Sequence, residues 1–238
     1  MTKGKKEGDR SELLTEEEMN RLINVVSGDL YFTTIYKLLR YTGRRIGEIY
    51  GTQRGKNYIG GLKLGDIDFS NNTIKTVILK KKKRNLKRKC NECGFERNVY
   101  GTKYCMKCGH QLESININNM RFEKPEETVI TLRPDAIDIL KVYVEQHRPA
   151  FKNKDYIFRD WSLVYLKKKI KQHVKQASIN KNFSLHGFRT YFISNMIKNG
   201  ITDNQIIKWT GHTNVSSLGN YNRLIPRDVE DKINKVNL

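Results

Sequence analysis

The residues with the most informative chemistry lie near the C-terminus. His186 and Arg189 are three positions apart, Gly211 is followed directly by His212, and Tyr221 comes nine residues later. A guanidinium presents a planar fork of donors that matches two phosphate oxygens, and a phenol becomes a covalent nucleophile when a neighbour takes its proton. Residues three apart lie on one face of a helix, so His186 and Arg189 are expected to address the same phosphate. The set therefore suits attack on a phosphodiester.

Composition indicates a polyanionic partner. The 238 residues include 45 Lys+Arg against 25 Asp+Glu, a formal charge of +20, and the isoelectric point is near 9.8. Such an excess of positive charge is typical of proteins that bind nucleic acid. No apolar run is long enough to span a bilayer, and the basic N-terminus lacks the apolar segment of a secretory signal. We therefore expect a cytoplasmic, nucleoid-associated protein that binds no membrane.

Four cysteines form a regular pattern. Cys90 and Cys93 make one CxxC pair, Cys105 and Cys108 make a second, and a glycine follows each pair. Two CxxC turns eleven residues apart are typical of a structural zinc site with four thiolate ligands. Two disulfides or four unrelated thiols are the alternatives, and the reducing compartment expected above favours zinc. Four thiolates leave no open position on the metal, so no catalytic role for zinc is expected.

Local patterns predict a mixed, mainly helical chain. A polar, basic tail over residues 1–13 is expected to be disordered, and helices are predicted after Thr15 and through residues 31–42, the second ended by Gly43. Polar residues and three glycines predict an exposed loop at Thr52–Gly61. Further predicted elements are strands at 64–69, 73–79 and 127–131, and helices that begin at Pro134, after Ser162 and after Thr202, the last ending at Gly211.

From Leu14 to the C-terminus, the sequence resembles the tyrosine recombinase and phage-type integrase family. The family's first motif, Thr-Gly-x-Arg-x-x-Glu, matches Thr42–Glu48 and identifies Arg45 as its arginine. The His-x-x-Arg box matches His186–Arg189, the Gly-His pair matches Gly211–His212, and Tyr221 stands where the family has its nucleophile. The resemblance implies an α+β, mainly helical catalytic domain of the DNA breaking-rejoining fold with a small antiparallel sheet.

The resemblance also implies a mechanism on double-stranded DNA. Tyr221 would attack a phosphodiester and leave a 3′-phosphotyrosine and a free 5′-hydroxyl, which a second strand would reverse. Arg45 and Arg189 would stabilise the charge on the five-coordinate phosphorus in place of a metal, so catalysis would need no cofactor. Glu48 would support the arginine or the fold. Family members assemble on DNA, which implies a homo-oligomer, a tetramer on its substrate.

A lysine and two histidines complete the set that the resemblance implies. The general acid for the leaving oxygen would be Lys80, with Lys81 and Lys82 as close alternatives in the same run of lysines. His186 and His212 would position or exchange protons on the phosphate and the phenol. A charge run is usually a solvated surface, so the other lysines of this run are expected to make only nonspecific phosphate contacts.

Two departures from the family leave alternatives open. Only the short tail precedes the catalytic domain at 14–238, so the chain is a minimal recombinase or the catalytic portion of a longer or split integrase, as in some archaeal viral integrases. A zinc ribbon at 88–112 is inserted in the domain, either as a grip on DNA or as a stabilising cap on a long hairpin. Apart from recombination, a nicking and resealing enzyme of topoisomerase type and a DNA-binding fragment without activity remain possible functions.

Overall fold

The computed structural model divides into two compact units, Met1–Leu79 with Glu126–Leu238, and Lys80–Pro125. It describes residues 12–54, 57–79, 87–98, 103–112, 126–211, 215, 218–219 and 221. Residues 1–11 of the predicted disordered tail lie outside this description. Glu12 and Leu13 are described, and they contact the turn before α6: the Glu12 amide donates to the Asn182 carbonyl, 2.7 Å away.

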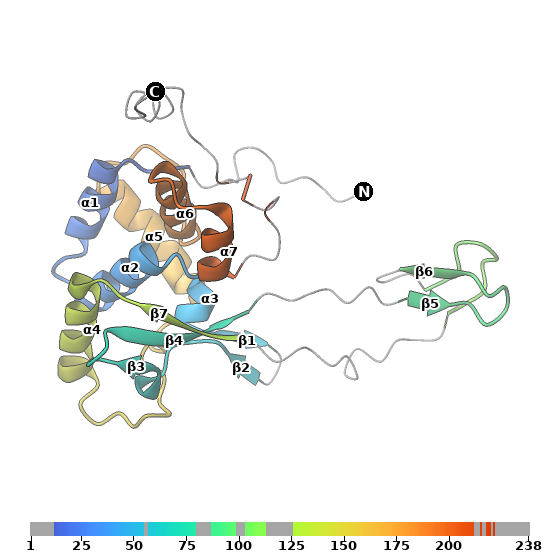
Figure 1. Cartoon of the computed structure of the whole chain (residues 1–238), viewed down its shortest axis with the longest axis horizontal. Coiled ribbons are helices and arrows are strands. Elements are labelled where there is room, and N and C mark those ends of the chain that lie inside the picture. Colours follow the sequence, from blue (N-terminus) through green and yellow to red (C-terminus); the bar gives the residue numbers. More distant parts are fainter. Residues whose placement is uncertain are drawn as a thin grey trace. The chain divides into compact units, whose positions relative to one another are not determined.

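Helices make up most of the larger unit (Figure 1). They are α1 (Glu16–Val25), α2 (Leu30–Thr42), α3 (Ile46–Ile49), α4 (Pro134–His147), α5 (Leu163–Gln176), α6 (Gly187–Lys198) and α7 (Asp203–Thr210). The helix starts predicted after Thr15 and Thr202 are confirmed, and each is a capping box, formed by Thr15 with Glu18 at α1 and by Thr202 with Gln205 at α7. Gly43 ends α2 and Gly211 ends α7, both in the left-handed conformation that glycine favours.

A small antiparallel sheet accompanies the helices. It contains β3 (Ile67–Asp68), β4 (Thr73–Ile78) and β7 (Glu126–Thr131) in the order β3-β4-β7. The strand predicted at 64–69 is only partly correct, because Leu64–Asp66 forms a short 3-10 helix, η2, before β3. The mainly helical α+β class is confirmed.

The prediction of an exposed loop at Thr52–Gly61 is wrong. The segment pairs as a hairpin of β1 (Thr52–Arg54) and β2 (Asn57–Ile59). The hairpin is held by Tyr58, whose hydroxyl donates to the Tyr50 carbonyl and whose ring lies 4.7 Å from the Arg159 guanidinium. Arg159 is far from this polar, glycine-rich segment in the sequence, so local composition could not reveal its contact with Tyr58.

The core of the larger unit is organised around α2. This helix contacts α1, α3, α4 and α6, and Ile35, Leu38 and Leu39 on it have no solvent exposure. The helix predicted to begin at Pro134 is confirmed as α4, which buries Ala136, Ile137, Leu140, Tyr143 and Val144. Because α2 packs on α6 over a long interface, the residue that ends α2 is positioned against the helix that carries Arg189.

Glycine at position 43 is required by both backbone conformation and space. Its φ is +61°, and a Cβ added there would lie 2.2 Å from a ring carbon of Phe192 on α6. We expect Gly43→Ala to lower the free energy of unfolding by about 1–3 kcal/mol, from the left-handed strain and the overpacking together. Urea unfolding of the purified chain measures the loss.

Gly28→Ala is the matched control, because a Cβ at position 28 meets no atom within 4 Å and Gly28 is not in the left-handed region. The free energy of unfolding of Gly28→Ala should stay within about 0.5 kcal/mol of the wild-type value. Equal stability of the two variants would show that the contact between Gly43 and Phe192 does not constrain the fold.

Candidate active site

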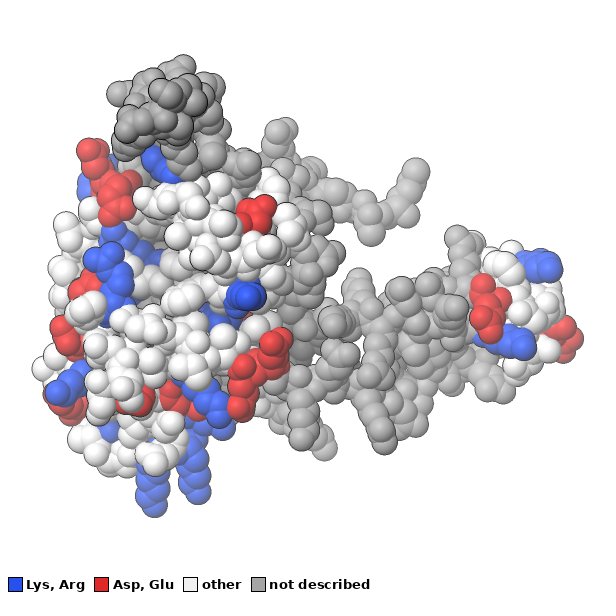
Figure 2. Space-filling view, in the orientation of Figure 1, with Lys and Arg blue, Asp and Glu red and all other residues white. Residues whose placement is uncertain are grey.

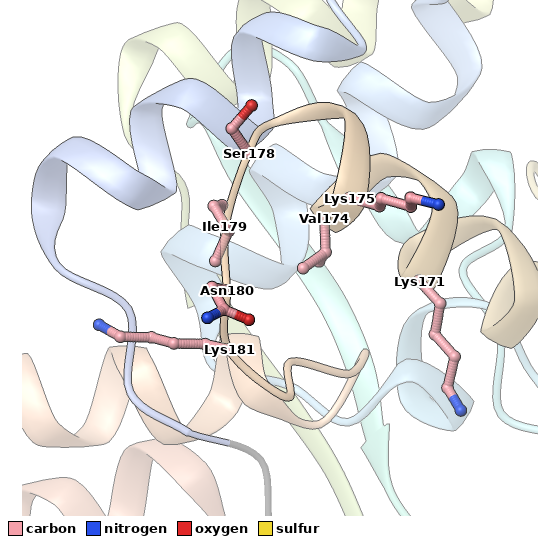
Figure 3. Close-up of a pocket in the computed structure, with 7 residues that line it drawn as sticks. All are labelled: Lys171, Val174, Lys175, Ser178, Ile179, Asn180 and Lys181. Carbon is pink, nitrogen blue, oxygen red and sulfur yellow. The ribbon is translucent and has the colours of Figure 1, made fainter.

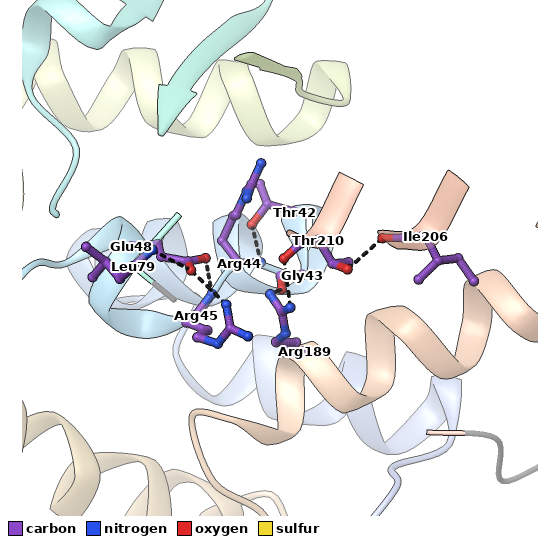
Figure 4. A network of polar contacts seen from close by, with 9 residues as sticks. All are labelled: Thr42, Gly43, Arg44, Arg45, Glu48, Leu79, Arg189, Ile206 and Thr210. Atoms are coloured by element: carbon purple, nitrogen blue, oxygen red, sulfur yellow. Dashed lines mark hydrogen bonds and ion pairs between the residues drawn. The ribbon is translucent and has the colours of Figure 1, made fainter. Parts of the chain in front are cut away.

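Arg189 joins the C-terminal ends of two helices. Its Nη1 donates to the Gly43 carbonyl at the end of α2 (2.9 Å), and its Nη2 donates to the Thr210 carbonyl at the end of α7 (2.8 Å) (Figure 4). The side chain has no solvent exposure. The C-terminus of a helix carries partial negative charge on unsatisfied carbonyls, so a guanidinium is stabilised between two such ends. Arg189 is therefore held rigidly by the backbone of two helices.

Glu48 holds Arg45 and the end of β4 together. One carboxylate oxygen of Glu48 accepts from the Arg45 amide (3.0 Å), and the other accepts from Arg45 Nη1 (2.9 Å) and from the Leu79 amide (3.3 Å). The Glu48 side chain is fully buried, whereas the Arg45 side chain is 28% exposed. A buried carboxylate with three donors positions its partners strongly, because leaving any of them unpaired is costly. Lys80, the next residue after Leu79, lies outside the described residues.

Tyr221 is fixed to α6, the helix that carries Arg189. Its carbonyl accepts a hydrogen bond from Ser194 Oγ (2.8 Å), and its amide donates to the Leu218 carbonyl (2.7 Å). The ring is half-buried against the small apolar cluster of Ile193, Ile206 and Leu218. A side-chain hydrogen bond joins the Tyr221 phenol to Arg189. The phenol and the buried guanidinium therefore share one location.

Electrostatic coupling places Arg45 near the same location. Burial and, to a smaller extent, the charge of Arg45 lower the pKa of Arg189, Glu48 and Tyr221 oppose the shift, and the net pKa is about 10. Arg189 remains charged at neutral pH. In Figure 4 the guanidinium groups of Arg45 and Arg189 point to the same side of the α2–α3 turn. Two guanidiniums, one partly exposed and one buried, can bind a phosphate whose negative charge offsets their repulsion.

The two predicted histidines have different outcomes. His186 occupies the N-cap position of α6, and its carbonyl accepts from the Arg189 amide (3.1 Å). His186 is exposed, whereas the Arg189 side chain is fully buried. The backbone of His186 has helical dihedrals, φ −73° and ψ −22°, so the three-residue spacing to Arg189 runs directly into α6. His212 lies outside the described residues; Gly211, which precedes it, packs against Ile78 at the end of β4.

Arg44, next to Arg45, is buried without a partner. It has no solvent exposure, and its three guanidinium nitrogens have no hydrogen bond to any described residue. Burial lowers its pKa, which the charge of Glu48 partly opposes. Figure 4 shows the side chain pointing away from Arg45 and Arg189. A desolvated charge without hydrogen bonds destabilises a fold, so Arg44 is an energetic cost beside the site.

The four cysteines of the smaller unit converge. The Sγ atoms of Cys90, Cys93, Cys105 and Cys108 all lie within 4.8 Å of one another. Such a cluster has the ligand type, number and spacing for one tetrahedral metal ion. Gly94 and Gly109, which follow the two CxxC pairs, have φ of +64° and +72°, so both turn as expected for glycine.

Hydrogen bonds in the cluster shift the pKa values of Cys105 and Cys108 in opposite directions. Backbone amides of Cys108 and Lys107 lower the pKa of the Cys105 thiol to about 6. Cys108 responds in the opposite direction: the His110 amide would lower its pKa, but hydrogen bonds with the other thiols raise it to about 12. The opposing shifts arise because sulfurs in contact cannot all ionise together, and a bound dication would replace the protons that they share.

A hollow elsewhere on the larger unit lacks the predicted chemistry. It lies at the end of α5 and is lined by Lys171, Val174, Lys175, Ser178, Ile179, Asn180 and Lys181 (Figure 3). Lys181 is already paired there with the Glu18 carboxylate (2.6 Å) and the Leu13 carbonyl (3.2 Å). The hollow is open and contains none of the predicted catalytic residues, so the polar network around Arg189 remains the candidate site.

One face of the molecule carries charges of both signs. Figure 2 shows Lys and Arg interspersed with Asp and Glu on the described atoms of the larger unit.

None of the described helices is both long enough and apolar enough to cross a bilayer.

Comparison with known proteins identifies the family. The family model of the phage integrase family matches residues 109–227, which is 119 of 238 residues and thus half of the chain. The chain belongs to the phage integrase family. The matched range contains His186, Arg189 and Tyr221 and begins after the Arg45 motif. No curated protein matches the chain significantly.

Solved structures share the fold of this phage integrase family member. XerA recombinase matches at TM-score 0.65 and 18% identity, covering 95% of this chain and 66% of that one. The Tn1549 transposon integrase in complex with a circular intermediate DNA matches at 0.61 and 14%, covering 98% and 68%. The catalytic domain of bacteriophage HP1 integrase matches at 0.53 and 14%, covering 95% of each chain. The predicted family and catalytic-domain fold are confirmed, and the chain spans about two thirds of the XerA chain's length.

Sequence reasoning missed several residues that position this site. The Ser194 hydroxyl that fixes Tyr221 and the Thr210 carbonyl that accepts from Arg189 carry no motif signal. Trp209 donates its indole N–H to the Thr42 carbonyl (3.0 Å), which satisfies another orphan group at the end of α2. Only the three-dimensional meeting of α2, α6 and α7 reveals these roles.

The unpartnered burial of Arg44 predicts a stabilising substitution. We expect Arg44→Met to raise the free energy of unfolding by about 1–4 kcal/mol, because an apolar side chain of similar length removes the desolvated charge. Thermal unfolding at pH 7 measures the change.

Arg40→Met, in the last turn of α2 just before the turn that contains Arg44, is the control. Arg40 is paired with Glu16 and donates to Asn20 Oδ1 (2.9 Å), so its loss should not stabilise the chain. Lower stability of Arg44→Met than of wild type would mean that Arg44 has an acceptor in the part of the chain that the structure does not describe.

Proposed function

We propose that the protein is a site-specific DNA recombinase or integrase that cleaves and rejoins strands through a 3′-phosphotyrosine. The observation that carries the proposal is the contact between the Tyr221 phenol and the buried Arg189 guanidinium, beside Arg45 and Glu48. A nucleophile next to two fixed cations is the arrangement that in-line attack on a phosphodiester requires. Membership of the phage integrase family supports the same conclusion.

Each described residue has a defined part in the proposed reaction. The Tyr221 oxygen forms a bond to the scissile phosphorus as the bond to the 5′-oxygen breaks, and the phenolic proton leaves to a neighbouring base. Arg189, whose position is set by two helix ends, and Arg45, whose position is set by Glu48, stabilise the negative charge that develops on the phosphoryl oxygens. The covalent link conserves the bond energy, so rejoining needs no nucleotide cofactor.

The remaining roles rest on residues that are exposed or not described. His186 is exposed at the start of α6, one turn from Arg189, and in the proposal it meets the bound phosphate from solvent. Lys80 would protonate the leaving 5′-oxygen, and the bond from the Leu79 amide to Glu48 supports a lysine positioned next to Arg45. His212 would follow the end of α7, whose last carbonyl accepts from Arg189.

The proposed organisation has three parts. Residues 14–238 form the catalytic domain, 88–112 form an inserted ribbon that binds one structural Zn²⁺ through Cys90, Cys93, Cys105 and Cys108, and 1–13 form a tail. The convergence of the four sulfurs supports the metal, and catalysis itself uses none. The proposed partner is double-stranded DNA in the cytoplasm, at the nucleoid, and strand exchange requires protomers that assemble on it, as a tetramer.

The nucleophile is tested with a nicked suicide substrate, a duplex whose cleavage releases a short fragment and so traps the covalent adduct. We expect wild type to form the adduct and Tyr221→Phe to form none. Arg189→Lys should slow adduct formation by about 10²–10³-fold, because lysine cannot donate to both helix ends and the phosphate.

Tyr191→Phe is the control for loss of a phenol on the same part of the fold, since Tyr191 is buried and its hydroxyl contacts Glu16. An adduct with Tyr221→Phe would refute the assigned nucleophile. Joined products from two labelled duplexes indicate recombination, whereas relaxation of supercoiled DNA without them indicates a nicking and resealing enzyme.

The metal is tested by its stoichiometry. We expect about one equivalent of zinc per chain in purified protein, released by a chelator, and a large loss of zinc in Cys93→Ser. Asn91→Ser, within the same turn but without a sulfur, should keep the full equivalent. Wild-type protein with two disulfides and no zinc would contradict the proposal.

A further inference from the structure

The smaller unit is an internal repeat of two turns. In the first turn the Cys90 amide donates to the Phe95 carbonyl (3.0 Å) and the Gly94 amide to the Cys90 carbonyl (2.9 Å). In the second, fifteen residues later, the Cys105 amide donates to the His110 carbonyl (2.7 Å) and the Gly109 amide to the Cys105 carbonyl (2.9 Å). The same backbone bonds form twice, so we call these the first and second knuckles (residues 89–96 and 104–111).

The pairing that closes the knuckles is also equivalent. Lys89 faces Glu96 in the β5 (Lys87–Lys89) and β6 (Glu96–Asn98) hairpin, and Tyr104 faces Gln111 in an antiparallel bridge. Both pairs are seven residues apart. Because the two halves share backbone geometry and supply two sulfurs each, every position of one has a structural counterpart in the other.

The side chains at counterpart positions differ sharply in chemistry. The tip of the first knuckle carries Asn91 and Glu92, and that of the second carries Met106 and Lys107. Met106 is 62% exposed, and Tyr104, the counterpart of Lys89, is 57% exposed. The first knuckle tolerates polar and acidic residues at these positions, so neither the turn nor the metal requires apolar ones. The exposed Tyr104 and Met106 of the second knuckle are therefore not required by the turn or by the metal, and they are free to contact a partner.

Charge identifies the kind of partner. The segment 80–125 contains thirteen Lys and Arg against four Glu, a formal charge of +9, which is nearly half of the chain's +20 in 46 of 238 residues. Lys103 and Lys107 directly flank the exposed Tyr104 and Met106, and no acidic residue lies between 97 and 112. Basic side chains contact phosphates, while aromatic and apolar ones contact bases and sugars.

We propose that the second knuckle is a DNA-contacting surface, made by Lys103, Tyr104, Met106 and Lys107, that binds duplex DNA while the first knuckle only completes the metal site. The lysines bind the phosphate backbone, and the exposed apolar side chains lie against the adjoining groove. This inference rests on the proposal that duplex DNA is the substrate. In this inference the inserted unit increases the affinity for duplex DNA, whereas the catalytic residues act on the scissile phosphate.

The test compares matched variants of the full-length zinc-loaded chain. Tyr104→Ser with Met106→Ser removes the apolar contacts of the second knuckle, and Asn91→Ser with Glu92→Gln changes the first knuckle at its tip. Binding of each to a fluorescent duplex is measured by anisotropy over a range of salt concentrations. We expect the second-knuckle variant to bind at least about fivefold more weakly, and the first-knuckle variant to bind as wild type or slightly more tightly.

A single charge change gives an independent readout. Lys107→Gln should reduce the slope of log affinity against log salt by about one, as expected when one phosphate contact is lost. Zinc content is measured for every variant and should stay at the wild-type level. If the variant with Tyr104→Ser and Met106→Ser loses zinc, the result with Lys107→Gln alone decides the proposal. Wild-type affinity and salt slope in the second-knuckle variants would overturn the proposal, as would equal losses in both knuckles.

Failure of this inference is distinguishable from failure of the proposed function. At saturating duplex, the second-knuckle variants should form the Tyr221 adduct at the wild-type rate, because the change affects only binding. Absence of any adduct in wild type, with binding still dependent on the second knuckle, would refute the enzyme and leave this surface intact.

Discussion

The rest of the larger unit depends on the hydrogen bonds that Arg189 donates to the ends of two helices. Its guanidinium connects the carbonyl of Gly43, at the end of α2, with that of Thr210, at the end of α7, from within the first turn of α6. Helix ends leave carbonyls without partners, so burying two of them together is costly unless a strong donor lies between them. One side chain on α6 thus satisfies a carbonyl at the end of each of two other helices. The same requirement brings a fixed positive charge to the place where Tyr221 lies.

Glu48 provides the complementary constraint. It neutralises part of the charge of Arg45 and, through the Leu79 amide, ties the α2–α3 turn to the end of β4. Arg45 and Glu48 are three positions apart in one short segment, so a single helical turn sets the distance between the guanidinium and the carboxylate. The strand end is set by the sheet. Fold stability and site geometry are consequently maintained by the same hydrogen bonds, which explains why a polar network can be buried here.

Local sequence patterns predicted where most helices begin, but they did not predict the hydrogen bonds that position the residues of the candidate site. Thr15, Pro134 and Thr202 mark helix starts because a cap satisfies orphan amides within a few residues, and CxxC turns repeat because the metal geometry is local. The hairpin at 52–59 contacts Arg159, and Arg189 donates to Gly43, and in both cases the partners are more than a hundred positions apart in the sequence. The motif distinguished Arg45 from Arg44, but no local signal predicted that packing buries Arg44 completely while the Arg45 side chain stays 28% exposed.

The two units use positive charge in different physical ways. In the larger unit the guanidinium of Arg189 is removed from water and aimed by backbone carbonyls, so its field acts over a short range with little screening. In the smaller unit Lys103 and Lys107 are exposed beside the four cysteines, where salt screens their charge and counterion release would govern the affinity for DNA that we propose. A buried charge can distinguish a transition state from a ground state because it cannot relax. An exposed one can only attract. Separating these tasks allows the inserted unit to change its surface residues without disturbing the buried network.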